Sequence, residues 1–98
     1  MSIVLVGGHE RMHKEYKGIG SKLGHKVKVF TKMPPRFEKA IGKPDVMVLF
    51  TSTVSHKMVG TALKEAKRKK IPIIRSHSSS GTSLENALLQ INDLIVAD

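Results

Sequence analysis

Cysteine is absent from this 98-residue sequence, so disulfide bonds, thiolate metal sites and catalysis by a thiol are excluded. Aromatic residues make up only 4% of the chain, which means that a core must be built from Val, Ile, Leu and Met. No apolar run approaches the roughly 20 residues of a membrane-spanning helix, and the first run is too short for a secretory signal. We therefore expect a cytoplasmic protein without a membrane span.

Acidic residues are scarce, because 8 Asp and Glu stand against 17 Lys and Arg, for a formal net charge of +9. A domain with this balance attracts anions such as nucleic acid, acidic lipid surfaces or phosphorylated metabolites, although the charge can equally serve solubility alone. The length and the hydrophobic content of 40% predict a single domain over residues 1–98.

Four short apolar segments predict β-strands. Ser2–Val6 and Asp45–Phe50 are continuously apolar, which indicates burial on both faces of a sheet. His25–Thr31 alternates and carries lysines, as an edge strand does, and Ile71–Arg75 is the fourth strand.

Helices are expected between and after these strands. The first runs from Arg11 to Leu23 with Gly24 as its stop, and the second is opened by Pro34-Pro35 and ends at Gly42. Thr53 or Ser55 caps the third helix. The segment Thr82–Glu85 reads as a capping box that starts the last helix, whose buried stripe comprises Leu84, Ala87, Leu88, Ile91 and Ile95.

The βα unit, repeated four times, predicts an α/β fold with a parallel sheet and right-handed crossovers. Placing the two apolar strands in the centre gives the order 2-1-3-4, a flavodoxin-like or Rossmann-like sheet with helices on both faces. Ligands of such folds bind beyond the carboxyl ends of the strands, at the switch point between strands 1 and 3.

Hydroxyls, imidazoles and cations follow the carboxyl ends of the strands, where helix N-termini add unpaired N–H groups. This combination suits phosphate or carboxylate, with the N–H groups of Gly8 and His9 as expected donors. The same residues can instead serve only as caps and turns. The candidate ligand-binding residues are Gly7, Gly8, His9, Arg11, Thr51, Ser52, Thr53, Ser55, His56, Ser76, His77, Ser78 and Ser79.

Several common site patterns are missing. The glycines do not spell G-x-G-x-x-G, and Thr31 and Lys32 stand where a dinucleotide site has its acidic residue. There is no P-loop, and Thr51 occupies the place of a phosphoacceptor aspartate. Glu10 is the only carboxylate near this edge, which argues against a Ser-His-Asp triad or carboxylate-bound Mg²⁺. We expect a binding domain rather than an enzyme, with no cofactor identified.

Two alternatives remain open. His9, His13, His56 and His77 could bind Zn²⁺, Fe or a haem, provided that His9 and His13 share a helix face. The basic run from Lys64 to Lys70 could bind nucleic acid, although it lacks interleaved aromatic residues. It can instead be a solvated helix end, whose cations complement the helix dipole.

Four segments together resemble one known family. They are GGHERMHKEY, LFTSTVSHKMV, AKRKKIP and RSHSSSGTSLENAL, in this order over nearly the whole chain. The sequence resembles the small bacterial DUF2325 family, whose name records an unknown function. The resemblance implies a fold and no activity, and no catalytic residue is carried over from it.

A homodimer is also expected. A four-stranded sheet leaves exposed edges, and Leu89, Leu94 and Val96 lie off the buried stripe of the last helix.

Overall fold

The computed structural model describes residues 1–96, with side chains described as far as Asn92, and contains one parallel sheet of four strands. The strands are β1 (Ser2–Val6), β2 (Lys26–Phe30), β3 (Val46–Phe50) and β4 (Ile73–Ser76). Their order in the sheet is β2-β1-β3-β4, and all three pairings are parallel. The predicted α/β class and strand order 2-1-3-4 are confirmed.

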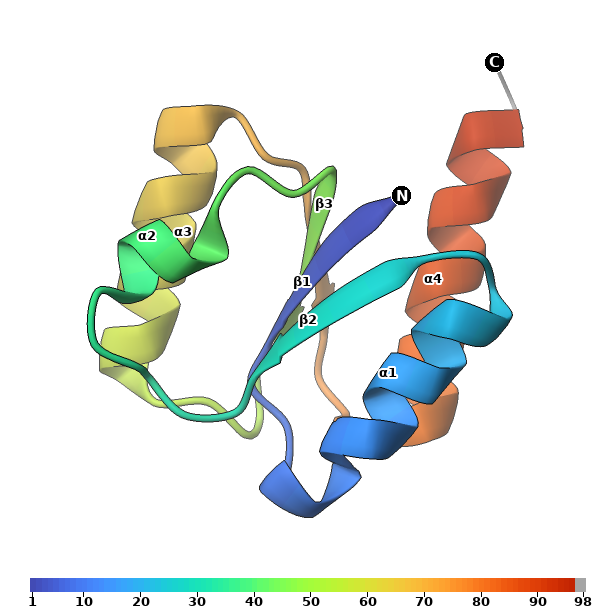
Figure 1. The fold of residues 1–98 in the computed structure, drawn as a ribbon, viewed down its shortest axis with the longest axis horizontal. Helices are drawn as coiled ribbons and strands as arrows, with labels where there is room; N and C mark the ends of the chain where they lie inside the picture. The colour runs from blue at the N-terminus through green and yellow to red at the C-terminus, as the bar shows by residue number, and fades with distance from the viewer. Residues whose placement is uncertain (97–98) are drawn as a thin grey trace.

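Helices cover both faces of the sheet (Figure 1). One face carries α1 (His13–Lys22) and α4 (Gly81–Val96), and the other carries α2 (Phe37–Ile41) and α3 (His56–Lys69). A 3₁₀ turn, η1 (Glu10–Met12), precedes α1. No helix within residues 1–96 has the length and apolar character needed to cross a bilayer.

The two central strands divide their side chains between two apolar layers, because successive residues of a strand point to opposite faces. Ile3 and Leu5 pack beneath α1 and α4, whereas Val4 and Val6 pack beneath α2 and α3. Every residue of β3 is buried. The edge strand β2 shows the alternation expected for it, since Val27 and Val29 are buried and its lysines are exposed.

Some helix starts differ from the sequence-based predictions. The turn η1 replaces the first predicted turn of α1, so the α-helix begins at His13 and not at Arg11. Pro34-Pro35 does not open α2, because Arg36 takes a left-handed conformation with φ 54° immediately before the helix. Of the two predicted caps of α3, Ser55 is correct, since its Oγ accepts a hydrogen bond from the Met58 N–H at 3.2 Å.

Helix α1 lies very close to β2, and Gly20 is the residue that permits this. Gly20 is buried, and a Cβ placed on it would overlap the Cγ2 methyl of Val27. The neighbouring Gly18 is exposed, with no atom near the position of its missing side chain. The two glycines of one helix therefore have different physical roles.

Candidate functional site

The turn after β1 binds to its neighbouring loops through its own backbone. The Gly8 N–H donates to Thr53 Oγ1 at 3.0 Å and to the Thr53 carbonyl at 3.3 Å, which ties the loop after β1 to the loop after β3. The His9 N–H donates to the Tyr16 hydroxyl at 3.4 Å. In this structure, therefore, the two N–H groups predicted to hold an anion both have acceptors within the protein.

Tyr16 links the loop after β1 to the loop after β4. Its hydroxyl donates to the Ser79 carbonyl at 2.7 Å while it accepts the bond from His9. The ring is fully buried, with its centroid 5.5 Å from that of Phe50. A buried side chain with a satisfied hydroxyl holds a single orientation, so Tyr16 fixes the distance between these two loops.

A hollow of about 390 Å³ lies where these two loops meet. We refer to it as the α4 hollow, and it is lined by His9, Arg11, Met12, Ser78, Ser79, Ser80 and Gly81. The loop after β1 supplies the imidazole and the guanidinium, and the loop after β4 supplies the hydroxyls. Four of the residues predicted for ligand binding, from segments far apart in the sequence, are thus brought together.

The N-terminus of α4 forms one wall of the α4 hollow. Ser80 caps the helix, because its Oγ accepts from the Ser83 N–H at 3.1 Å. The helix begins at Gly81, so the capping box predicted to start at Thr82 is wrong. Over residues 1–96, the N–H groups of Gly81 and Thr82 meet no protein acceptor. These are the unpaired donors that a helix N-terminus offers to an anion.

The remaining predicted residues lie elsewhere along the carboxyl edge. Gly7 and Thr53 are structural members of the loop contacts, and Ser55 is the α3 cap. Ser76 lines a separate groove beside β4. The last four predicted residues are exposed and do not line the α4 hollow: Thr51, Ser52, His56 and His77.

Ser80 and Gly81 line the α4 hollow but were not among the predicted site residues. The run Ser78-Ser79-Ser80-Gly81 carries a signal for them, because Ser80 is as good an N-cap residue as Thr82. A second hollow of about 510 Å³ on the other face contains two further cations that were not predicted, Arg36 and Lys57, beside the Ser55 cap.

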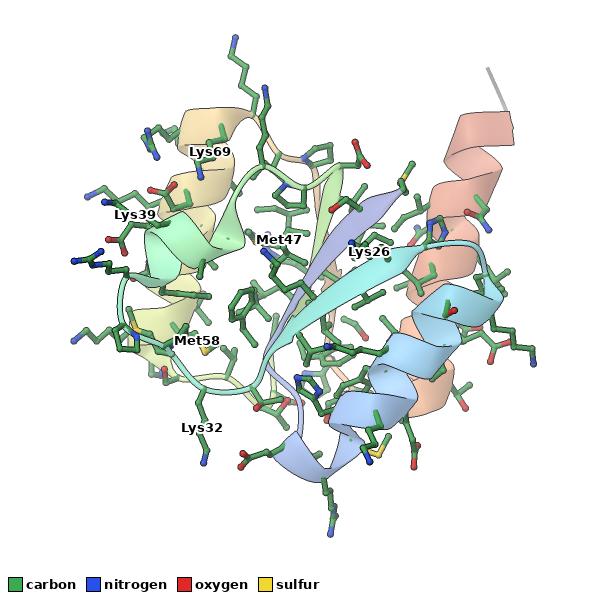
Figure 2. All side chains as sticks on the ribbon, viewed as in Figure 1. Lys26, Lys32, Lys39, Met47, Met58 and Lys69 are labelled. Atoms are coloured by element: carbon green, nitrogen blue, oxygen red, sulfur yellow. The ribbon has the colours of Figure 1, made fainter. Side chains whose placement is uncertain are left out.

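The carboxylate nearest to this edge is paired with a cation. Glu10 Oε2 lies 3.0 Å from Lys32 Nζ, at the end of β2, and both side chains are mostly exposed. Lys32 extends from the carboxyl edge in Figure 2. Because no carboxylate lines the α4 hollow, its polar groups are hydrogen-bond donors, hydroxyls and a cation.

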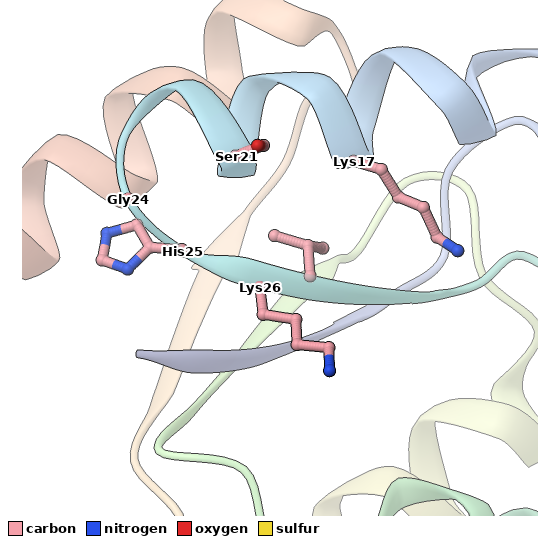
Figure 3. Close-up of a pocket in the computed structure, with 6 residues that line it drawn as sticks. Lys17, Ser21, Gly24, His25 and Lys26 are labelled. Atoms are coloured by element: carbon pink, nitrogen blue, oxygen red, sulfur yellow. The ribbon is translucent and has the colours of Figure 1, made fainter.

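A further hollow of about 520 Å³ lies at the opposite, amino end of the sheet (Figure 3). Lys17 and Ser21 reach it from α1, and Lys26 from the start of β2. None of the predicted ligand-binding residues lines it. The strand-end rule for parallel sheets therefore favours the α4 hollow as the candidate site.

His9 and His13, the pair of the metal alternative that had to share a helix face, do not lie on one α-helix. His9 has extended backbone angles and lies outside the α-helix, which starts at His13. His56 begins α3, and His77 lies in the loop before α4. Within the part of the chain that the structure describes, no three His, Asp or Glu side chains are close enough together to hold a metal ion.

The basic run at the end of α3 contributes two of its cations to the fold. Glu65 is buried, with Arg68 at 2.8 Å and Lys69 at 3.3 Å. Lys69 also donates to the Gly42 carbonyl at 2.7 Å, which joins α3 to the end of α2. Figure 2 shows Lys69 and Lys39 on these neighbouring helices. The remaining cations of the run are Lys64, Lys67 and Lys70.

The ion pairs of Glu65 predict a pH-dependent contribution to stability. The hydrogen bond from Arg68 lowers the pKa of Glu65 in the folded protein, against the opposing effect of burial. Since the folded pKa is below the unfolded one, about 4.3, this stabilisation is complete above that value and is lost as the pH falls through the folded pKa. Glu65→Gln should therefore reduce the difference in urea midpoint between pH 7 and the acid range, whereas Glu15→Gln on the exposed face of α1 should not.

Comparison with known protein families shows to which family the chain belongs. A family model described as an uncharacterized protein conserved in bacteria matches residues 2–91. The chain belongs to the DUF2325 family. The match covers nearly the whole DUF2325 fold described above, from β1 into α4, and it assigns no ligand. No curated protein and no solved structure matches the chain.

Proposed function

We propose that this DUF2325 protein binds a small molecule bearing a phosphate or a carboxylate in the α4 hollow. The observation that supports this proposal is that Arg11 and His9 line the same hollow as Gly81, at a helix start where the N–H groups of Gly81 and Thr82 have no acceptor among residues 1–96. A helix of 16 residues directs its dipole at that point, which favours negative charge. The volume of the hollow is in the range of small-molecule sites.

The donors have distinct roles in the proposed complex. The N–H groups of Gly81 and Thr82 bind the anion. Those of Gly8 and His9 do not, because they are already bonded within the protein. Arg11 is exposed and can form a charge-assisted, bidentate contact with an oxyanion. The hydroxyls of Ser78 and Ser79 and the imidazole of His9 complete the ring of polar groups around the hollow.

Removing Arg11 tests the proposal. Arg11→Ala should weaken the binding of inorganic phosphate or a nucleoside monophosphate, measured by isothermal titration, by about 1.5–3 kcal/mol, because a charge-assisted hydrogen bond is lost. Lys14→Ala is the matched control, since Lys14 is an exposed cation of α1 that does not line the hollow. Equal affinity in wild type and Arg11→Ala would contradict the proposed role of Arg11.

Amide chemical shifts locate the anion independently of affinity. Adding inorganic phosphate should shift the amide resonances of Gly81 and Thr82 more than those of Gly8 and His9, whose N–H groups are bonded to Thr53 and Tyr16. Raising the salt concentration should weaken these shifts, because screening reduces the attraction of exposed cations. A shift pattern centred on another part of the protein would place the anion outside the α4 hollow.

A further inference from the structure

The positive charge of this protein is unequally distributed along the chain. Of the 17 Lys and Arg residues, Arg75 is the only one after residue 70, and Glu85, Asp93 and Asp98 lie in the same part of the sequence. Strand β4 and helix α4 therefore form the part of the molecule where cations are fewest. Two copies of a protein with net charge +9 repel each other least when they meet there.

The two edge strands of the sheet also differ in the number of cations that they carry. Edge strand β2 exposes Lys26 and Lys28, and Lys28 Nζ also donates to the Ala40 carbonyl of α2 at 3.0 Å. Lysines on an edge strand oppose pairing with another strand. Edge strand β4 has no lysine and carries only Arg75. Pairing with a further strand is thus discouraged at β2 and open at β4.

The isoleucines of β4 are incompletely covered on both faces of the sheet. Ile73 is half-buried against the apolar layer beneath α2 and α3, and Ile74 is half-buried against the layer beneath α1 and α4. A helix docked on either face would cover one of these side chains. An added strand that brings its own two layers covers both, so the geometry favours extension of the sheet.

A groove of about 280 Å³ runs between β4 and α4. We call it the β4 groove, and its lining residues other than Arg75 are uncharged: Ile74, Ser76, Ser83, Asn86, Ala87 and Gln90. We propose that a second copy of this chain occupies this surface. Its β4 pairs antiparallel with β4 of the first copy about a two-fold axis, and the two sheets become one of eight strands. Leu89, exposed on α4, lies beyond the β4 groove, and the side chains of Leu94 and Val96 lie outside the described residues.

Spin labels on the two edge strands test this arrangement. The chain has no cysteine, so Arg75→Cys and Lys28→Cys each provide one labelling site on an exposed strand residue. Side chains stand perpendicular to a sheet, so neither label blocks the strand edge. In the proposed dimer the backbones at position 75 lie within about 10 Å, whereas those at position 28 are seven strand spacings, about 34 Å, apart. Electron–electron distance measurements distinguish these values.

A charge variant tests the same surface without a label. Gln90→Arg places a cation in the β4 groove of each copy and should weaken dimerisation about tenfold or more, measured by analytical ultracentrifugation. Ser21→Arg, which adds the same charge at the exposed end of α1, should leave it unchanged.

Three results would overturn the proposal. They are a monomer throughout the micromolar to submillimolar range, a dimer in which labels at position 28 are the closer pair, and a mass that keeps rising with concentration. The last would mean that the cation-poor surface of β4 and α4 on one copy binds the lysine-bearing β2 edge of the next, so that the copies form an open chain and not a closed dimer. Arg11→Ala leaves the β4 groove intact, so loss of the anion site and loss of the dimer are separable.

Discussion

Replacing Gly20 with alanine is expected to destabilise the protein by about 1–3 kcal/mol, although alanine is the better helix former. The added Cβ would overlap the Cγ2 methyl of Val27 and lie 3.2 Å from its Cβ. Val27 is buried and β-branched, so its side chain has few alternative rotamers. Helix α1 and strand β2 would have to separate, and both carry part of the apolar layer beneath α1 and α4.

Gly18→Ala is the matched control, two residues earlier in the same helix. No atom lies within 4 Å of the position of its added Cβ, and the residue is exposed. This substitution should stabilise the protein by about 0.5–1 kcal/mol through the lower backbone entropy of the unfolded chain. Urea unfolding of the two variants checks the opposite signs. A stabilised Gly20→Ala would mean that α1 does not approach β2 this closely.

Gly8→Ala is the second substitution with a large expected effect. Gly8 has φ 89°, and an added Cβ would lie 2.8 Å from both Cε2 and the hydroxyl of Tyr16. The left-handed backbone costs an L-residue about 1–2 kcal/mol, and displacement of the buried ring adds about 1–3 kcal/mol. Movement of Tyr16 also breaks its bond to the Ser79 carbonyl, which positions the loop of the α4 hollow. Both the unfolding midpoint and the affinity for phosphate should fall.

Gly24→Ala separates the two causes. Gly24 has φ 83°, but no atom lies within 4 Å of the position of its added Cβ, and it is far from the carboxyl edge. It should therefore show the backbone cost alone and keep the phosphate affinity of the wild type. If Gly8→Ala and Gly24→Ala lose equal stability, the contact between Gly8 and Tyr16 is not a constraint on the turn.

Apolar periodicity was sufficient to predict the fold of this DUF2325 protein. Continuous burial of Val46–Phe50 and alternation in Lys26–Phe30 are visible as residue patterns, because burial on two faces or one face selects different side chains. The order β2-β1-β3-β4 follows from those patterns and the handedness of the crossovers. The helix starts at His13, Phe37 and Gly81 were not predicted. Met12 and Arg36 precede the first two without a side-chain capping bond, so the sequence carries no cap signal there, and before α4 Ser80 and Thr82 are equally good candidates.

For the candidate site, too, the residue types at the strand ends were predictable from the sequence, whereas their contacts were not. The sequence by itself determined that serines, histidines and Arg11 follow strand ends, and hence that they share one edge of a parallel sheet. Only the tertiary structure decided which of them meet. Whether a backbone N–H is free depends on acceptors such as Thr53 and Tyr16, which are 45 and 7 residues away from their partners. Because of those contacts the N–H groups of Gly8 and His9 have acceptors within the protein, whereas those of Gly81 and Thr82 have none among residues 1–96, and no local sequence pattern predicts this difference.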